Sequence, residues 1–411
     1  MTVLNRCDAC CAVESKLPAS APGDDTSNRL RALHVINGEH YAGAERVQDL
    51  LAARLPDFGV DVAFACVKPD KFPALRRSQQ TVLHQIPMRQ RWDLRPAWKL
   101  ARLLRAGKFD ILHAHSARAA MIAAVASRLS GVPLVLHVHG NTATEIRGRA
   151  WTRLNAWAER QLLPRCAAVI AVSASVADYL RSAGAASNKV FVVPNGVPSR
   201  REMRPRLDYS SRADNRTSRL GFVALLRPRK GLEVVLDAAA ILLRQGLDIS
   251  LRIVGRFETA EYELEIAQQV ARLQLADRID WRGFQTDVDA ELNQMDVLLF
   301  PSVLPEGLPM VVLEAMAAGV PIVATRVPGV TDVLRDGENG LLVEPNDASA
   351  LASGISQLIE NPALAERLRT AAWHDQQEHY SDKSMAEAVA GIYRQVLARS
   401  TVPFLARGVV Q

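Results

Sequence analysis

The sequence contains no long apolar stretch. Its longest apolar run, AAMIAAVA (Ala119–Ala126), is far shorter than the roughly 20 residues that a helix needs to cross a bilayer. The N-terminal segment MTVLNRCDACCAVES also lacks the apolar core of a secretory signal peptide. The composition, 48% hydrophobic and 23% charged over 411 residues, is that of an ordinary globular protein with two to three domains. We therefore expect a cytoplasmic protein.

Cysteine is also scarce. The five cysteines do not form the framework of a disulfide-stabilised protein; they are Cys7, Cys10, Cys11, Cys66 and Cys166. The first three have the spacing of half a metal knuckle, but no second ligand pair at suitable spacing follows. We expect no metal there. Residues 1–28, rich in Ser, Ala, Pro and Asp, are predicted to be a disordered leader.

A complete G-x-G-x-x-G fingerprint is missing after the first predicted strand, which argues against a nicotinamide-dependent enzyme. The segment between that strand and its helix reads NGEHYAGAE, from Asn37 to Glu45. Its glycines allow backbone N–H groups to approach a phosphate at the start of a helix. Gly43 is the candidate for this close approach.

Positive charge exceeds negative charge only mildly, with a formal net charge of +6, but it is concentrated in one segment. Between residues 71 and 108 a single acid, Asp93, faces ten bases: Lys71, Arg76, Arg77, Arg89, Arg91, Arg95, Lys99, Arg102, Arg105 and Lys108. Trp92 and Trp98 lie among them, and RPAWKLARLLRAG is amphipathic at helical spacing. This face suits an anionic membrane surface or a lipid phosphate. A solvated helix that packs on its own domain explains it equally well, whereas no nucleic-acid recognition motif accompanies the charge.

Short apolar runs alternate with helical segments along the whole chain, which predicts an α/β protein with two doubly wound parallel sheets. The first array contains RALHVING, VDVAFACV, VLHQI, DILHAH, LVLHVHG, AVIAVS and KVFVVPNG; the second contains RLGFVALL, ISLRIVG, RIDWRGF, DVLLF, PIVAT and GLLVEP. A polar segment rich in Arg, Ser, Pro and Asp separates them. We predict an N-terminal domain over 29–198, a linker over 199–218, and a C-terminal domain over 219–375. The carboxyl ends of both strand sets should face one interdomain cleft.

Two glutamates eight residues apart are the strongest functional signal. The segment PSVLPEGLPMVVLEAMAAGVPIVAT (Pro301–Thr325) reads as the end of a strand, a loop, a helix and a second strand. Glu306 lies in the loop beyond the carboxyl end of a strand, where open α/β sheets bind ligands. Glu314 lies in a helix whose N-terminus favours an anion such as a diphosphate. One carboxylate beside a leaving group and one for hydroxyl groups suits a sugar-nucleotide site.

This segment resembles the E-x7-E block of retaining glycosyltransferases of family four, and the resemblance runs from about Leu33 to Pro362. It implies the GT-B fold, two Rossmann-like domains facing a cleft, with a last helix within 376–411 that returns to the first domain. It further implies that Glu314 binds the donor ribose. Glu306 would lie at the donor sugar beside the reacting carbon, together with the donor-binding residues Gly307 and Leu308. Gly43 matches the glycine next to the donor phosphate.

The segment LRPRKG (Leu226–Gly231) joins the first strand of the second domain to its helix and supplies cations for a leaving diphosphate. Lys230 matches the lysine of the family's K-G motif. The partner arginine of the family normally lies where this chain has Leu225. We expect Arg227 to reach the phosphates from its altered place, and Arg229 to point to solvent.

The strand LVLHVHG (Leu134–Gly140) brings two histidines to one face. His139 falls at the histidine of the family's T-x-H-G motif and is predicted to contact the donor sugar, whereas His137 replaces the threonine. His113 and His115 of DILHAH are interpreted as structural. Asp287-x-Asp289 resembles the D-x-D metal motif of the other glycosyltransferase fold, but helix capping explains it better.

Together these features predict a retaining glycosyltransferase that moves a sugar from a UDP- or GDP-sugar to an acceptor hydroxyl. Glu306, His139 and Lys230 are the predicted catalytic residues, without a metal ion or cofactor. The basic face suggests a glycan or lipid-linked acceptor of envelope polysaccharide, lipopolysaccharide or glycolipid synthesis, at the inner face of the plasma membrane. A sugar-nucleotide epimerase of the same fold and a non-catalytic sugar-nucleotide-binding protein are the alternatives.

Overall fold

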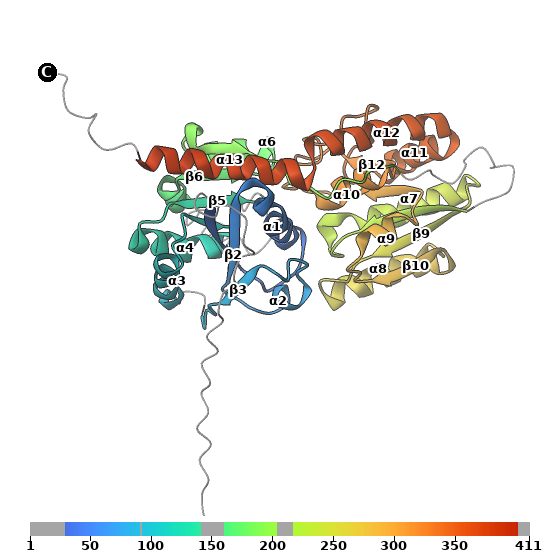
Figure 1. The fold of residues 1–411 in the computed structure, drawn as a ribbon. Coiled ribbons are helices and arrows are strands. Elements are labelled where there is room, and N and C mark those ends of the chain that lie inside the picture. Colours follow the sequence, from blue (N-terminus) through green and yellow to red (C-terminus); the bar gives the residue numbers. More distant parts are fainter. Residues whose placement is uncertain (1–28, 91–92, 141–159, 204–216, 402–411) are drawn as a thin grey trace, which may run out of the picture.

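The computed structural model describes residues 29–90, 93–140, 160–203 and 217–401. The predicted leader, Trp92 and Arg91, most of the predicted linker and the tail after residue 401 lie outside these ranges. Two parallel sheets, each covered by helices, form the two halves of the molecule (Figure 1). No helix in the described ranges is both long and apolar enough to cross a membrane.

The first sheet has seven parallel strands in the order β3-β2-β1-β4-β5-β6-β7. Its strands are β1 (Leu30–Ile36), β2 (Val60–Cys66), β3 (Val82–Gln85), β4 (Ile111–Ala114), β5 (Leu134–Val138), β6 (Ala168–Ala171) and β7 (Val190–Val192). Its helices are α1 (Gly43–Arg54), α2 (Phe72–Leu75), α3 (Arg95–Ala106), α4 (Ala117–Ser130) and α6 (Ala174–Ser182). The central strands are largely apolar because helices bury both faces of a parallel sheet, and histidines are their buried polar residues.

The second sheet has six parallel strands in the order β10-β9-β8-β11-β12-β13. Its strands are β8 (Ser218–Val223), β9 (Ile249–Val254), β10 (Ile279–Gly283), β11 (Val297–Phe300), β12 (Ile322–Thr325) and β13 (Leu341–Val343). Its helices are α7 (Leu232–Arg244), α8 (Ala260–Arg272), α9 (Val288–Leu292), α10 (Met310–Ala318), α11 (Ala348–Glu360) and α12 (Pro362–His379). All thirteen apolar runs singled out in the sequence contribute to these strands, which confirms the predicted fold class.

The strand order reverses between β1 and β4 in the first sheet and between β8 and β11 in the second. Chains on the two sides of such a switch point leave the sheet in opposite directions, which opens a crevice at the carboxyl ends of the strands. The loops that carry Gly43, Lys230 and Glu306 follow β1, β8 and β11 respectively. Both switch points therefore lie where the predicted site residues are.

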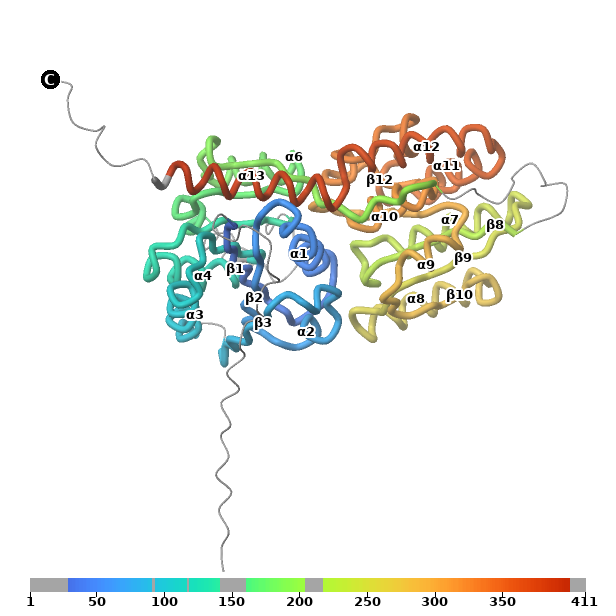
Figure 2. The backbone as a smooth tube through the Cα atoms, viewed as in Figure 1, coloured from blue at the N-terminus to red at the C-terminus, as the bar shows by residue number. Residues whose placement is uncertain are grey.

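The last described helix, α13 (Asp382–Thr401), runs from the second half onto the first (Figures 1 and 2). Its first turn is held by Asp382, whose carboxylate lies 2.7 Å from the Arg54 Nε of α1. Further along, Arg394 donates to the carbonyl of Phe58 at 2.5 Å. Tyr393 is fully buried against the first sheet. Helix α13 thus packs on the half that contains the first strand.

Candidate active site between the two sheets

Two helix N-termini meet across the boundary between the halves. Gly43 is the first residue of α1 and Met310 the first of α10, and a β-carbon on Gly43 would lie 3.5 Å from Met310 Cγ. Within the described chain, the side chain of the N-cap residue caps neither helix, since these residues are Ala42 and Pro309. At α1 the carboxylate of Glu45 accepts a hydrogen bond from the backbone N–H of Ala42 at 3.2 Å. The positive ends of two helix dipoles lie close together at this boundary, which favours an anion.

Glu306 lies at the centre of a cationic loop. Its Oε1 is 2.7 Å from Lys230 Nζ and 3.5 Å from Arg229 Nη2, and it also accepts a hydrogen bond from Ser302. Burial works to raise the pKa of Glu306, but Lys230 and Arg229 outweigh it and hold the pKa below its usual value. The carboxylate is thus kept ionised although its side chain is only 11% exposed.

One of the two arginines of the loop lies elsewhere than expected. Arg229 is not solvent-facing as predicted: its side chain is 16% exposed and donates to the carbonyl of Pro305 at 2.9 Å. Arg227 instead lies 3.6 Å from the carboxylate of Glu258, on the side of β9. The reason is local, because Pro228 starts a single 3-10 turn (Pro228–Lys230) that directs Arg229 and Lys230 toward the Glu306 loop. Leu225, at the position of the family's arginine, is 37% exposed.

Gly307 touches the backbone of the first half. A β-carbon on Gly307 would lie 1.9 Å from the carbonyl oxygen of His139, so only glycine allows this approach. The next residue, Leu308, accepts a hydrogen bond from Asn195 Nδ2 at 3.0 Å through its carbonyl oxygen. The loop after β11 is therefore fixed against the end of β5, and Glu306 lies one residue from the His139 backbone contact.

Glu314 is paired across the halves. Its Oε1 lies 2.5 Å from Arg46 Nη1 of α1, and its side chain is 6% exposed. Burial raises the pKa of Glu314 to about 7, against the opposing effect of Arg46. Nearby, Arg77 donates to the carbonyl of Thr286 at 3.0 Å, which adds a second contact between the halves.

Five histidines share one face of the first sheet, and His139 is one of them; the others are His34, His113, His115 and His137. His139 Nε2 lies 3.2 Å from His115 Nδ1. Burial lowers the pKa of His139 to about 4 and that of His34 to about 3, and it lowers the pKa of the other three as well. All five are neutral imidazoles near neutral pH.

The D-x-D motif is a helix cap, as predicted. Asp287 accepts a hydrogen bond from the backbone N–H of Ala290 at 3.1 Å at the start of α9. Asp289 pairs with Arg200 at 2.9 Å, at the point where the chain crosses between the halves. Both carboxylates thus have structural partners.

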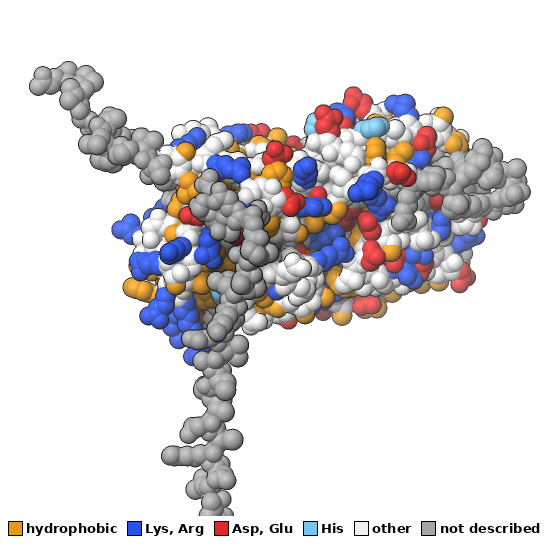
Figure 3. All heavy atoms as spheres, in the orientation of Figure 1, with side chains coloured by type: hydrophobic (Ala, Val, Ile, Leu, Met, Phe, Trp, Pro, Cys, Tyr) orange, Lys and Arg blue, Asp and Glu red, His pale blue; other side chains and the backbone are white. Residues whose placement is uncertain are grey.

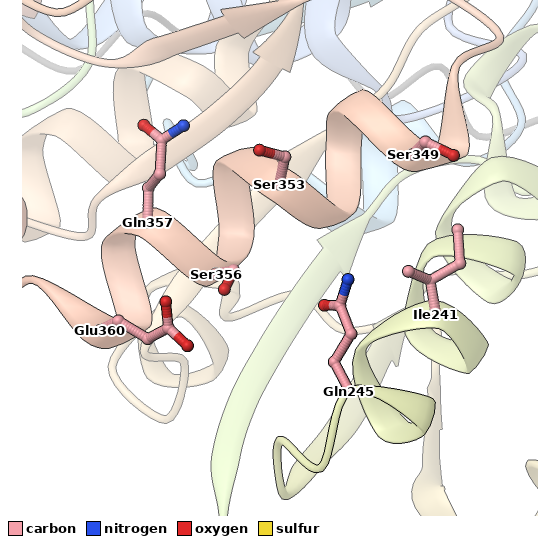
Figure 4. A pocket seen from close by; sticks show the side chains of 7 residues that line it. All are labelled: Ile241, Gln245, Ser349, Ser353, Ser356, Gln357 and Glu360. Carbon is pink, nitrogen blue, oxygen red and sulfur yellow. The ribbon is translucent and has the colours of Figure 1, made fainter.

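The surface hollows of the described chain include one at α7 and α11 and one at the Lys230 loop. Figure 4 shows the first, between the end of α7 and one side of α11, lined by Ile241, Gln245, Ser349, Ser353, Ser356, Gln357 and Glu360. Lys230 precedes the start of α7, so about 20 Å of helix separates this hollow from the Lys230 loop. The second adjoins that loop and is lined by Pro228, Arg229, Glu233, Val234, Val303, Leu304 and Asn346. Of these two hollows, the second touches the candidate site.

Three contributors to the site were missed from the sequence: Arg46, Arg229 and Asn195. Arg46 occupies the first turn of α1 only three residues after Gly43, and Asn195 stands in PNG directly after β7. Both residues follow the carboxyl end of a parallel strand, and this position could have marked them as candidates for the site. Their partners in the second half are more than a hundred residues away, however, and no spacing rule connects them.

The fold and this site define a glycosyltransferase of the GT-B type. Among solved structures, Anabaena HepE in complex with UDP and glucose has a TM-score of 0.77 at 21% identity, and the match covers 89% of this chain and 100% of that one. Residues 204–375 match the family model described as glycosyl transferases group 1, and residues 41–201 match glycosyltransferase family 4.

Curated relatives agree. The phosphatidyl-myo-inositol mannosyltransferase of Mycobacterium leprae is 30% identical over 308 residues, 72% of this chain and 76% of that protein. The alpha-D-kanosaminyltransferase of Streptomyces kanamyceticus is 29% identical over 327 residues, 74% of this chain and 81% of that protein. The chain belongs to the group 1 glycosyltransferases, with a family 4 N-terminal half.

Proposed function

We propose that the protein transfers a sugar from a nucleoside-diphosphate donor to an acceptor hydroxyl, with retention of configuration at the anomeric carbon. The observation that carries the proposal is the convergence of two helix N-termini, at Gly43 and Met310, beside the Lys230–Glu306 pair. Such a place attracts a diphosphate and stabilises the charge that develops as it leaves.

Each predicted residue has a role in this proposal. Lys230 neutralises the departing diphosphate, and Arg227 and Arg229 of the same loop assist it. Glu306, held ionised by these cations, lies beside the positive charge that develops at the reacting carbon. Glu314 accepts hydrogen bonds from the ribose hydroxyls once Arg46 gives way.

Retention follows when bond making and bond breaking occur on the same face of the sugar. The acceptor oxygen bonds to the anomeric carbon as the bond to the diphosphate oxygen breaks, and that diphosphate oxygen takes the acceptor proton. His139 and the Gly307 backbone orient the sugar, while contact between the halves excludes water that would hydrolyse the donor.

The donor class is proposed as a UDP- or GDP-sugar. UDP and glucose bound to HepE, a structural neighbour, support a uridine nucleotide, and the name of the mycobacterial relative supports a lipid-linked acceptor. Envelope polysaccharide, lipopolysaccharide or glycolipid synthesis is the process that this acceptor chemistry favours.

The first test is binding and turnover with a panel of UDP-, GDP- and ADP-sugars. A donor at about 100 times its Kd should stabilise the fold by about 2.7 kcal/mol, which thermal denaturation detects. We expect Glu314→Gln to lose this stabilisation. Glu306→Gln should lose release of nucleoside diphosphate. Glu338→Gln is the matched control, because Glu338 forms an exposed ion pair with Arg335 at 2.6 Å.

Product analysis separates the alternatives. An anomeric centre that keeps its configuration in the isolated product supports retention, and an inverted one contradicts it. An epimerised sugar nucleotide without transfer would identify an epimerase, and binding without turnover would identify a binding protein. No stabilisation and no nucleoside diphosphate with any donor would overturn the proposed function.

We also propose that α3 contacts an anionic membrane surface. Trp98 and Leu94 are 68% and 51% exposed, and Lys99, Arg102 and Arg105 are exposed on the same short helix. Figure 3 shows Lys and Arg side chains gathered over the part of the first half where Figure 1 places α3. An apolar tip ringed by cations is the pattern of an interfacial helix.

Sedimentation with vesicles tests this contact. Vesicles that contain phosphatidylglycerol should retain the protein at low salt, and Trp98→Ala should release it. Trp281→Ala is the control, because Trp281 is also exposed, at 44%, but lies in the second half. Equal retention of both variants, or of all forms on neutral vesicles, would contradict a contact through α3.

A further inference from the structure

The five-histidine face of the first sheet is a polar layer in an apolar core. Five of the nine histidines of the chain lie there, on β1, β4 and at the end of β5. The parallel register places His34 opposite His113. Residues two apart along a strand lie on the same face, so His115 shares the face of His113, and His139 shares the face of His137. Ring centroids of neighbouring histidines are as close as 4.1 Å.

A chain of hydrogen bonds orders part of this layer. His115 Nε2 lies 3.2 Å from His34 Nδ1, His34 Nε2 lies 3.0 Å from the Tyr393 hydroxyl, and that hydroxyl lies 2.5 Å from His113 Nδ1. The chain is satisfied when His115 donates to His34, His34 to Tyr393, and Tyr393 to His113. In this arrangement His115 Nδ1 carries a lone pair, which accepts a hydrogen bond from His139 Nε2 at 3.2 Å when no ion is bound.

Other nitrogens of the layer have no hydrogen-bond partner among the described residues. They are both ring nitrogens of His137, Nδ1 of His139 and Nε2 of His113, and all are buried. An unpaired buried polar group destabilises a fold, so a layer that only filled space would be apolar.

We propose that His115, His137 and His139 form a binding site for a divalent transition-metal ion, with Zn²⁺ as the best fit. His115 Nδ1 and His139 Nε2 are 3.2 Å apart. Two nitrogens at the usual Zn–N distance around a tetrahedral ion are about 3.3 Å apart. One nitrogen of His137 completes a trio whose atoms lie within 4.8 Å of one another.

The surroundings match those of known histidine sites. A ligating imidazole normally uses its second nitrogen for a hydrogen bond that fixes the ring, and His34 provides this bond for His115. Three imidazoles without a thiolate are the ligand set of zinc sites that keep a fourth position open. His139 is the least buried of the three.

This site was not expected from the sequence, from which we predicted no metal. The H-x-H pairs of DILHAH and LVLHVHG are separated by more than twenty residues, and only the pairing of β4 with β5 makes them neighbours. His139 belongs to both the proposed donor site and the metal site. The metal site is tested separately from the transfer reaction, because ion binding is measured without donor or acceptor.

The experiment uses the full-length chain without a histidine tag, stripped with a chelator and equilibrated with Zn²⁺ or Co²⁺. We expect one equivalent of ion by mass spectrometry of the metal content, and a Tm that rises when Zn²⁺ is added. His137→Leu should lose both, with an affinity loss beyond the roughly 10- to 100-fold that changes around the ligands cause. His84→Leu, on β3 outside the layer, should keep both.

Several outcomes would overturn the site. They are a wild-type chain that binds no ion, or an ion that His137→Leu still binds. The site would also be contradicted if His137→Leu had a higher Tm than the wild type and the Tm of the wild type did not change when Zn²⁺ was added. X-ray absorption of the Zn²⁺-loaded wild-type chain needs no variant: an imidazole shell supports the site, and sulfur ligands would place the ion on cysteines instead. A failure here leaves the donor-binding test unchanged.

Discussion

Replacing Arg46 by methionine keeps much of the side chain's apolar volume and removes the guanidinium that lies 2.5 Å from Glu314 Oε1. The side chain of Glu314 is only 6% exposed, and Arg77 is the other cation that lowers its pKa. The ionised form of Glu314 becomes less favourable in the folded protein, whereas the unfolded chain is unaffected. Arg46→Met should therefore destabilise the protein only at pH values where Glu314 is ionised.

The magnitude follows from the pKa of Glu314, which is about 7 in the folded protein against 4.5 when exposed. Because the folded state binds this proton more tightly than the unfolded chain does, protonated Glu314 stabilises the fold. This stabilisation is complete below pH 4.5 and is lost as the pH rises through 7. One pH unit in this window corresponds to about 1.4 kcal/mol, so the wild type loses roughly 3 kcal/mol from this group. In Arg46→Met the loss continues above pH 7.

Thermal denaturation between pH 5 and pH 8.5 measures the difference in stability between the wild type and Arg46→Met. All other titrating groups are shared by the two proteins, so their contributions cancel in this difference. The wild type and Arg46→Met should be nearly equal at pH 5. At pH 8 the variant should be less stable by about 1–2 kcal/mol, or about 2–6 °C in Tm. Arg46→Met combined with Glu314→Gln should lose this pH dependence. A gap of the same size at pH 5 and pH 8, or a double variant as pH-sensitive as the single one, would refute the reasoning.

Three further predictions concern the backbone contact and the histidine layer. Gly307→Ala places a β-carbon 1.9 Å from the carbonyl oxygen of His139, so the halves should separate and the radius of gyration by small-angle scattering should rise; an unchanged radius would contradict this. Tyr393→Phe removes the hydroxyl shared by His34 and His113 and should cost about 1–3 kcal/mol in chemical denaturation, whereas wild-type stability would show that these bonds contribute nothing. Burial lowers the pKa of His34 to about 3 and that of His139 to about 4, against 6.5 in the unfolded chain. The folded protein therefore has the full stabilisation from these neutral rings above pH 6.5 and loses it as the pH falls. The free energy of unfolding drops by roughly 5 kcal/mol for His34 and roughly 3 kcal/mol for His139 when each is fully titrated. The denaturation midpoint should fall steadily from pH 6.5 to pH 4, and a flat profile would count against the buried neutral layer.

Much of the fold was predictable because its signals are local. A strand buried on both faces must be apolar throughout, as in DVLLF and PIVAT, and Gly319 and Pro321 mark where helix and strand must separate. The same logic located Glu306 and Lys230 in loops after strands. The order of the strands within each sheet could not be predicted in this way, however. Nothing local to the chain indicates that β1 lies between β2 and β4.

The amino-acid sequence by itself determined the two βα arrays, the family and the loops that carry Gly43, Lys230 and the glutamate pair. Only the tertiary structure decided which charges meet: Arg229 rather than Arg227 beside Glu306, and Arg46 against Glu314. It also brought five histidines from three strands into one layer. The physical reason is range, because local propensity and periodicity act over a few residues, whereas these contacts depend on how two sheets and their helices pack.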